Sequence, residues 1–300
     1  MCDLRGVIPV IPTPFHDDES VDLRSLKRAV EFVSSQRLGG MVLPAYASEF
    51  YKLTEIERES VVAAAIETNG RRVPLIAQAN HGSARAASEL AQRYERLGAD
   101  LISFALPRQF ATSANDLQDF SAQIAGSVSI PVMIQDFNPG GPTIGADFVA
   151  AIQQRCPNIK YVKLEDLQII DKLVAIRSAI GERVGIIIGW GGYTMLEAIP
   201  LGIRGIMPGV SIADLLNRVF TWRQESKNEL AYDLFARLMP YIAFSLTNLE
   251  LSHAMEKRLL VRRGIIATDK VRSLSLTPST EVSRHMDFLI ERMLHVIHSA

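Results

Sequence analysis

The chain has 300 residues, of which 48% are hydrophobic, and a formal net charge of −1. This length allows one barrel-sized core, and the absence of a basic stripe argues against a nucleic-acid partner. Cys2 and Cys156 give neither metal-ligand spacing nor a disulfide framework, and Pro9 and Pro12 come too early for a secretory h-region. No apolar run is long enough to cross a bilayer. We therefore expect a cytoplasmic protein without a membrane partner.

Short apolar runs alternate with helical patterns along most of the chain. Several of these runs are continuously apolar, which is typical of parallel strands buried on both faces. In chain order, the predicted strands are Gly6–Ile11, Gly40–Pro44, Val73–Ala79, Asp100–Ala105, Pro131–Asp136, Lys160–Glu165, Val184–Gly189 and Arg204–Pro208.

Helical periodicity fills the segments between these runs. Thr54 and Glu57 have the spacing of a capping box ahead of the apolar residues Val61–Ile66. Residues Ala84–Leu97 place apolar side chains at helical spacing and end at Gly98, a typical helix stop. Further helices are predicted at Phe148–Gln154, Ile169–Ile180 and Tyr193–Leu201.

Eight strand–helix alternations predict an α/β fold, the (β/α)₈ TIM barrel. The alternative, an open doubly wound sheet, would need a topological switch and usually a phosphate-binding turn. We place the barrel and its active site at residues 1–216. Residues 217–300 have the pattern of two or three amphipathic helices, including Leu230–Leu246 and Val282–Ile297. They form a helical extension that we do not expect to fold independently.

Lys163 is unusual because it lies inside the apolar run Ile159–Leu164. A buried lysine must find a partner or lose its proton, because burial disfavours the ammonium form. An amine at the end of a barrel strand is suited to forming a Schiff base with a carbonyl substrate. Because side chains alternate along a strand, Glu165 shares a face with Lys163 and is a candidate acid–base partner. In the alternative interpretation, Lys163 faces the helices or pairs with Glu165 only structurally.

Other polar residues follow the ends of the predicted strands, where active sites of such barrels lie. Asp136 either hydrogen-bonds a substrate hydroxyl or closes its own turn. Trp190, in a glycine-rich turn, either shapes the pocket or packs as an ordinary aromatic residue. His, Asp and Glu form no compact cluster in the sequence, so we predict no bound metal.

Four segments carry a family resemblance, and one of them, Leu53-Thr54 followed by Glu57-Arg58, resembles the start of the helix after the second strand. Gly6–Phe15 ends in Thr-Pro-Phe, Tyr161–Glu165 contains Lys163, and Ala198–Gly209 has the pattern of an eighth-strand region. In order and spacing they resemble the Schiff-base lyases of the dihydrodipicolinate synthase and N-acetylneuraminate lyase superfamily. The resemblance implies that Lys163 condenses with a 2-keto acid, that no cofactor is used, and that the chain forms a homotetramer or a dimer.

The chain departs from this family where protons are transferred. The family's Gly-Thr-Thr-Gly-Glu loop is Ala45–Glu49 here, so the relay threonine is missing at Ala47, and Ser48 is the available substitute. The tyrosine after the fifth strand is absent whether it aligns with Gln135 or with Phe137. That phenol normally shuttles a proton during imine formation.

Two further departures concern the second substrate of dihydrodipicolinate synthase. Gly140-Gly141-Pro142 replaces the arginine that grips this substrate, and Arg108 and Gln109 replace paired tyrosines after the fourth strand. Because both groups are missing, an authentic dihydrodipicolinate synthase is disfavoured. Members that act on 2-keto-3-deoxy sugar acids are similar to this chain in a Gln-Asp pair after strand five and a Lys-x-Glu on strand six.

We therefore predict a cofactor-independent lyase that forms a Schiff base between Lys163 and a 2-keto acid. The substrate is a pyruvate-type or a 2-keto-3-deoxy sugar acid, and the enzyme acts as an aldolase or a dehydratase. The predicted catalytic residues are Lys163, Glu165 and Ser48. The predicted substrate-binding residues are Tyr46, Ala47, Gln135, Asp136, Gly189, Trp190 and Val210.

Two alternatives stay open. The chain could be a dihydrodipicolinate synthase that condenses pyruvate with aspartate semialdehyde, provided other groups replace the missing phenol and arginine. It could also be a barrel that has lost catalysis and only binds a keto acid. Retention of Lys163 argues against this loss, whereas the altered loop Ala45–Ser48 argues for it.

Overall fold

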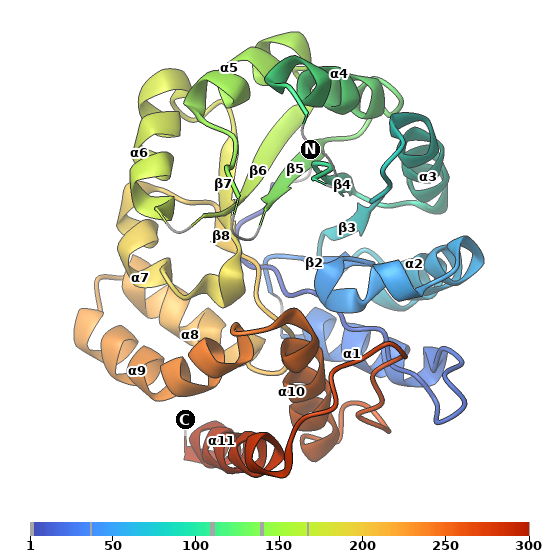
Figure 1. The fold of residues 1–300 in the computed structure, drawn as a ribbon. Coiled ribbons are helices and arrows are strands. Elements are labelled where there is room, and N and C mark those ends of the chain that lie inside the picture. Colours follow the sequence, from blue (N-terminus) through green and yellow to red (C-terminus); the bar gives the residue numbers. More distant parts are fainter. Residues whose placement is uncertain (1–2, 37, 109–111, 139–140, 167, 300) are drawn as a thin grey trace.

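Eight parallel strands form the centre of the computed structural model, which describes residues 3–36, 38–108, 112–138, 141–166 and 168–299. The strands pair in the order β1-β8-β7-β6-β5-β4-β3-β2, and Val10 bridges to both Val42 and Gly209, which closes the barrel. Each strand overlaps one predicted run, so the predicted TIM barrel is confirmed (Figure 1). The strands are β1 (Gly6–Val7), β2 (Met41–Leu43), β3 (Leu75–Gln78), β4 (Leu101–Ala105), β5 (Val132–Phe137), β6 (Ile159–Glu165), β7 (Gly185–Ile188) and β8 (Gly205–Ile206).

Side chains alternate along these strands and divide the core into two parts. Inward residues such as Ile76 and Met133 form a cluster inside the barrel, and outward residues pack beneath the helices. Tyr161 belongs to the inner cluster, and its hydroxyl accepts a hydrogen bond from the Leu4 N–H at 3.0 Å. Because Leu4 precedes β1, this contact helps to close the N-terminal end of the barrel.

The connecting helices form a ring around the strands (Figure 1). The capping box predicted at Thr54 is present, since Thr54 Oγ1 accepts the Glu57 N–H at 3.2 Å and Glu57 accepts the Thr54 N–H at 2.8 Å. The ring consists of α1 (Leu23–Ser35), α2 (Glu55–Asn69), α3 (Ala84–Leu97), α4 (Ala114–Ala125), α5 (Ala146–Arg155), α6 (Ile169–Ile180), α7 (Met195–Ala198) and α8 (Ala213–Gln224).

Two of the predicted helices, α3 and α6, begin and end where expected, but the helix predicted at Tyr193–Leu201 is wrong in extent. Only the four residues of α7 are α-helical there, and Ile199–Leu201 forms a 3₁₀ turn. Pro200 has no N–H group and therefore cannot continue the α-helical hydrogen bonding.

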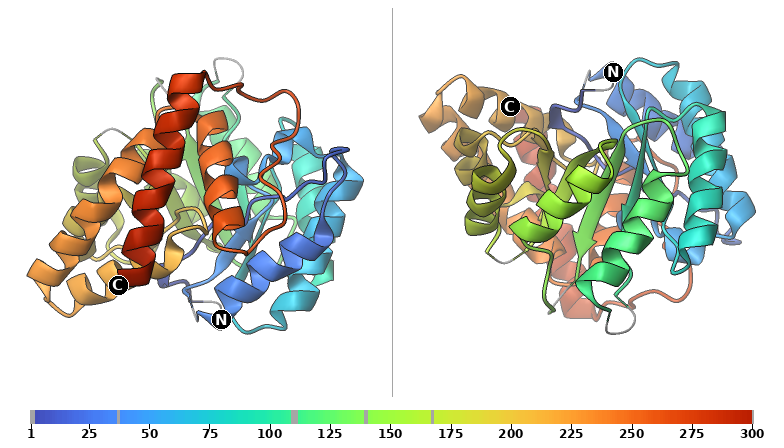
Figure 2. Two further views of the ribbon diagram at one scale, coloured as in Figure 1. Left: turned by 90° about the horizontal axis from the view of Figure 1, so that it is seen from below. Right: turned by 90° about the horizontal axis from the view of Figure 1, so that it is seen from above.

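Three more helices follow the barrel: α9 (Asn228–Ser245), α10 (Leu249–Arg262) and α11 (Thr280–Ser299). α9 packs on α8, and α11 lies across α9 and α10 (Figure 2). The expected boundary between residues 216 and 217 falls inside α8, which continues without a break across it. The extension is therefore joined to the barrel by a continuous helix.

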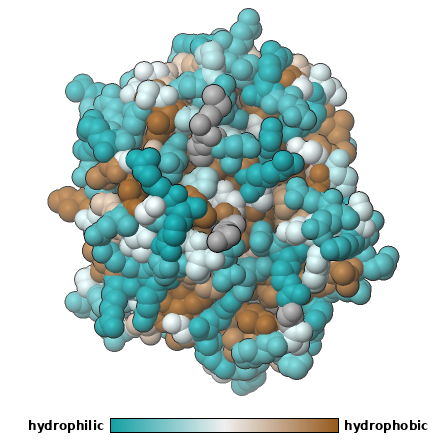
Figure 3. Space-filling model, turned by 180° about the vertical axis from the view of Figure 1, so that it is seen from behind, coloured by the Kyte–Doolittle hydropathy of each residue, from teal (hydrophilic) through white to brown (hydrophobic). Residues whose placement is uncertain are grey.

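The surface on the side opposite to the view of Figure 1 is largely hydrophilic, with scattered apolar residues (Figure 3). Single apolar side chains on a surface are ordinary in folded proteins. Within the described residues, no helix combines the length and the apolar character needed to span a bilayer.

Candidate active site

A cavity of about 490 Å³ lies at the C-terminal ends of the strands. Side chains of β5 and β6 and the turns after β2, β7 and β8 form one part of its wall. The end of α9, the start of α10 and the turn between them form the rest. The cavity therefore lies between the barrel mouth and the C-terminal helices, and the extension contributes to it directly.

Lys163 and Glu165 both line this cavity from β6. Lys163 Nζ lies 3.2 Å from Glu165 Oε1, and the two side chains are only 7% and 9% exposed. Lys163 thus has the carboxylate partner that a buried lysine requires. Its side chain faces the cavity and not the helix layer, so a small molecule can approach the amine.

Two glutamines hold the second oxygen of Glu165. Gln135, which is opposite Lys163 in the β5–β6 register, donates from Nε2 to Glu165 Oε2 at 2.7 Å. Gln78 on β3 in turn donates to Gln135 Oε1, and both glutamines are buried. This chain of hydrogen bonds leaves one carboxylate oxygen directed at Lys163 and fixes the other.

Gly189, which follows β7, positions Glu165 by leaving space for it. A Cβ built on Gly189 would overlap the Glu165 carboxylate. The φ of Gly189 is −85°, so other residues could adopt its φ and the requirement for glycine is steric. Gly189 is not among the residues that line the cavity. Gly189 therefore leaves the space that the Glu165 carboxylate occupies, and its predicted contact with the substrate stays a prediction.

The turn after β2 presents two free backbone donors to the cavity. Residues Tyr46–Ser48 form a 3₁₀ turn, and the N–H groups of Tyr46 and Ala47 have no hydrogen-bond partner among the described residues. Both residues line the cavity. Because backbone N–H groups seldom remain unpaired away from water, these donors suit an acceptor on a bound molecule.

Tyr46 also brings a phenol to the cavity. Its ring centroid lies 4.8 Å from that of Phe137, one of the two positions with which the missing family tyrosine aligns. Burial raises the pKa of the Tyr46 phenol, and the nearby Glu165 raises it further. The phenol is therefore protonated at neutral pH and is available as a hydrogen-bond donor.

Ser48 and Asp136 do not line the cavity. Ser48 is fully buried, and its Oγ donates to the Ile11 carbonyl at 2.6 Å. Asp136 accepts from Arg108 at 2.7 Å and from the Ile144 N–H at 2.6 Å. These bonds hold Asp136 against the segments that follow β4 and β5, and its predicted substrate-binding role stays a prediction. The predicted catalytic role of Ser48 stays a prediction that its geometry does not support.

Trp190 lines the cavity, and its backbone has the positive φ of 49°. Its indole Nε1 is buried, with no partner in the part of the chain that the structure describes. Val210 is buried and does not line the cavity, although the adjacent Gly209 does. Gln109 and Gly140, which entered the comparison with the family pattern, lie outside the described residues.

Sequence reasoning missed Gln78 and the helical part of the wall. Gln78 had a signal, because it is a polar residue inside the apolar run Val73–Ala79. His253 and Glu256 had none, because tertiary packing alone brings α10 to the barrel mouth. Burial lowers the pKa of His253 to about 3 and raises the pKa of Glu256. Among the described residues, no group of three or more His, Cys, Asp or Glu side chains could hold a metal ion.

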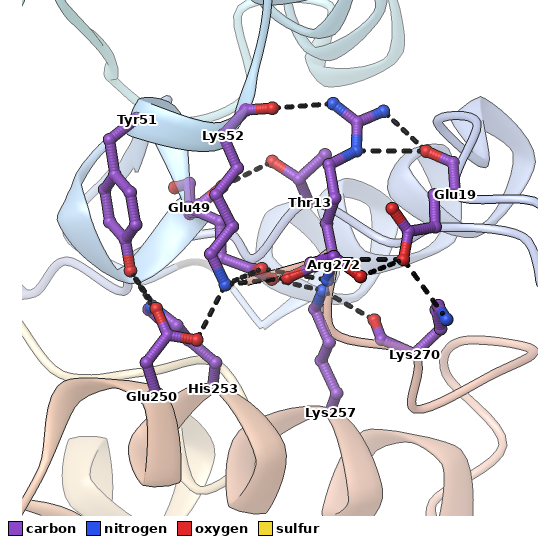
Figure 4. A network of polar contacts seen from close by, with 12 residues as sticks. Thr13, Glu19, Glu49, Tyr51, Lys52, Glu250, His253, Lys257, Lys270 and Arg272 are labelled. Atoms are coloured by element: carbon purple, nitrogen blue, oxygen red, sulfur yellow. Dashed lines mark hydrogen bonds and ion pairs between the residues drawn. The ribbon is translucent and has the colours of Figure 1, made fainter. Parts of the chain in front are cut away.

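A buried ionic network ties the turn after β2 to α10 (Figure 4). Glu49 accepts hydrogen bonds from Lys257 and, at 3.0 Å, from Lys52, whose Nζ also lies 2.6 Å from Glu250. The Lys257 and Glu49 side chains are 1% and 0% exposed, and burial lowers the pKa of Lys257. Because Glu49 directly follows the turn with the free donors, the network fixes this turn relative to the helical wall.

Replacing Lys257 with methionine should reduce the free energy of unfolding by about 3 kcal/mol, because one partner of a buried ion pair is removed. Lys227→Met is the matched control: Lys227 and its partner Glu225 are 54% and 48% exposed. Loss of such an exposed pair should cost no more than about 1 kcal/mol. Urea unfolding followed by circular dichroism compares the two variants. Equal losses would show that burial of the Lys257–Glu49 pair has no special effect.

A closed barrel with a buried lysine–carboxylate pair at its mouth defines the class to which the chain belongs, the (β/α)₈ barrel enzymes. The model of the Dihydrodipicolinate synthetase family matches residues 3–294, and the chain therefore belongs to this family of lyases. The predicted family and enzyme class are confirmed.

Individual relatives show the range of the family. The chain is 28% identical over 302 residues to the L-2-keto-3-deoxyarabonate dehydratase of Azospirillum brasilense, which covers 97% of each chain. It is 34% identical over 161 residues to a 4-hydroxy-tetrahydrodipicolinate synthase of Rhizobium meliloti (strain 1021), which covers 53% of this chain and 54% of that one. The solved dihydrodipicolinate synthase of Rhodopseudomonas palustris is similar with a TM-score of 0.90 at 21% identity, over 97% of this chain and 98% of that chain.

Proposed function

We propose that the chain is a dehydratase that forms a Schiff base between Lys163 and C2 of a 2-keto-3-deoxy sugar acid. The observation that carries this proposal is the buried pair in the cavity, where Lys163 Nζ lies 3.2 Å from a Glu165 carboxylate held by Gln135. An amine becomes nucleophilic when an adjacent base accepts its proton. Glu165 is placed to accept that proton from Lys163.

The free N–H groups of Tyr46 and Ala47 anchor the carboxylate of the keto acid in this proposal. They line the same cavity as Lys163 and have no partner among the residues described. A carboxylate is the acceptor that suits two such donors, because hydrogen bonds to ionised groups are the stronger ones. Bound there, the keto acid would present its C2 carbonyl to Lys163.

The reaction loses one molecule of water from the sugar acid. The Lys163 amine attacks C2, and Glu165 passes the proton that it took from Lys163 to the former carbonyl oxygen. This oxygen leaves as water, an iminium forms, and Glu165 is again a carboxylate. Glu165 takes a proton from C3, the C4–O bond breaks, and the hydroxyl leaves as water with the proton that Glu165 took up. The Tyr46 phenol donates a hydrogen bond to the departing oxygen, in place of the phenol missing from β5. Hydrolysis of the imine then consumes the water released first and frees Lys163.

The relatives support dehydration over the alternatives. The similarity to the L-2-keto-3-deoxyarabonate dehydratase extends along the whole chain, whereas the similarity to the Rhizobium meliloti synthase covers about half of it. The missing phenol and arginine argue against condensation with aspartate semialdehyde. Aldol cleavage starts from the same iminium but places the base at the C4 hydroxyl, whereas dehydration places it at C3.

Analysis of the products tests the proposal. The protein is incubated with five- and six-carbon 2-keto-3-deoxy sugar acids, and the products are identified by mass spectrometry. Loss of water with an intact carbon chain is expected, and release of pyruvate would instead identify an aldolase. Substrate recovered unchanged from the whole panel would favour a barrel that only binds keto acids.

Gly189→Ala should lower kcat/KM about 10²-fold, because the added methyl group displaces the Glu165 carboxylate from Lys163 and small misplacements of catalytic groups are costly. Gly145→Ala is the matched control: the φ of Gly145 is −98°, and a Cβ built there meets nothing within 4 Å. Steady-state kinetics compares the two variants. A Gly189→Ala variant as active as the control would show that this position does not determine where Glu165 lies.

A further inference from the structure

The charges around the cavity restrict which substrates fit. Among the described residues that line it, Lys163 is the sole cation, and Glu165 and Glu256 are the carboxylates. His253 also lines the cavity but is uncharged at neutral pH, because burial lowers its pKa to about 3. In the proposed reaction, the Lys163 amine becomes part of the imine. The walls then offer no side-chain cation dedicated to a second anionic group of the substrate.

Four cations on the segments around the barrel mouth are already paired. Lys52 lies 3.0 Å from Glu49 and 2.6 Å from Glu250, and Lys257 is bonded to Glu49. Arg108 is bonded to Asp136, and Arg263 lies 2.7 Å from Asp214. None of these four cations lines the cavity. Because each is already bonded to a carboxylate, a substrate anion would have to displace that partner in order to recruit one.

The helical end of the cavity carries the Glu256 carboxyl group, whose pKa is raised by burial. Ser211 donates to this carboxylate from its N–H at 2.7 Å and from its Oγ at 2.6 Å. A Cβ on Gly209 would overlap Glu256, so the absence of a side chain at Gly209 makes room for it. A second carboxylate on the substrate would therefore meet a fixed carboxyl group whose two oxygens already accept bonds from Ser211, and among the described residues no side-chain cation lines this end of the cavity to compensate its charge.

Neutral polar groups are available instead. The buried Trp190 Nε1–H has no partner in the described part of the chain and belongs to a residue that lines the cavity. Ser252 brings a hydroxyl to the helical end, whereas the Tyr241 hydroxyl is already bonded to Ser211 Oγ at 3.2 Å. The Trp190 and Ser252 groups suit the hydroxyls of a sugar chain, since buried polar groups are normally hydrogen-bonded.

We propose that the substrate carries a single carboxylate and an uncharged, hydroxylated tail that extends toward Trp190 and Glu256. The chain would thus select 2-keto-3-deoxy aldonic acids and reject the corresponding aldaric acids, which carry a second carboxylate. This inference rests on the proposed function and refines its substrate class.

The test uses two six-carbon acids that differ only at C6, a 2-keto-3-deoxy aldonic acid and its aldaric counterpart. Their dissociation constants are measured by calorimetry and their kcat/KM values by steady-state kinetics. We expect the aldonic acid to be preferred about 100-fold. In Glu256→Gln this preference should fall at least tenfold. Glu229→Gln, which removes a charge from an exposed residue on α9, should leave the preference unchanged.

Equal binding of the two acids, or an unchanged preference in Glu256→Gln, would overturn the inference. If neither acid binds, the inference also fails. The proposed reaction and the proposed substrate class can be tested separately, because calorimetry measures binding without requiring turnover. A strong preference for the aldonic acid without any loss of water would overturn the proposed dehydration while supporting the substrate class. Loss of water from both acids at similar rates would support the proposed dehydration and overturn the substrate class.

Discussion

Lys163→Met is expected to lower kcat/KM by at least about 10³-fold, because it removes the amine on which every proposed step depends. Methionine keeps the unbranched shape of the lysine side chain without its terminal amine and suits a residue that is 6% exposed. Steady-state kinetics measures the loss, and thermal unfolding checks that the variant is folded.

Lys160→Met is the matched control for this variant. Lys160 lies on the same strand, but three residues from Lys163, so its side chain points to the other face. The same substitution there should change kcat/KM less than about threefold. If Lys163→Met kept most of the activity while folded, the imine chemistry would have to be abandoned.

Glu165→Gln is expected to lower kcat by about 10²- to 10⁴-fold, the usual contribution of a general acid–base group. Glutamine keeps the shape of the side chain and can still bond to Gln135, but it cannot take a proton from C3. The Schiff base should still form, more slowly, because the amine of Lys163 remains. Rapid-quench kinetics followed by borohydride reduction separates imine formation from the loss of water.

A surface variant controls for the change in net charge. Glu182, whose side chain is 82% exposed, can be changed to glutamine without touching the cavity. Full turnover in Glu165→Gln would remove Glu165 from the mechanism. Complete loss of imine formation would instead assign it to activation of Lys163 alone.

The fold could be predicted because local rules and tertiary packing agree along the barrel. Continuous apolar runs marked the buried parallel strands, and Gly98 marked the end of α3. The prediction failed at Tyr193–Leu201, where hydrophobic periodicity continues but Pro200 interrupts the α-helical hydrogen bonding.

Strand alternation could predict only the site residues that lie on strands, because side chains alternate between the two faces of a strand. The spacing of Lys163 and Glu165 placed both on one face of β6, and both line the cavity. The same rule separates Gln135 from Asp136, because neighbours on a strand point to opposite faces. Gln135 faces the cavity, whereas Asp136 is bonded to Arg108 outside it.

The sequence patterns could not predict that α9 and α10 form part of the cavity wall. Glu256 follows Lys163 by more than ninety residues in the chain, and only the packing of α10 brings it to the cavity. The periodicity of a helix predicts which face is buried but not against which partner. The proposed preference for a substrate with a single carboxylate therefore rests on the structure and not on the motif that contains Lys163.

Reductive trapping tests the central claim most directly. The protein is incubated with pyruvate, reduced with borohydride and digested, and its peptides are analysed by mass spectrometry. We predict a reduced pyruvate adduct on the peptide that contains Lys163 and no adduct on the peptide that contains Lys257, a lysine that is also buried. An adduct confined to another lysine, or none with pyruvate or any 2-keto-3-deoxy acid, would contradict the account.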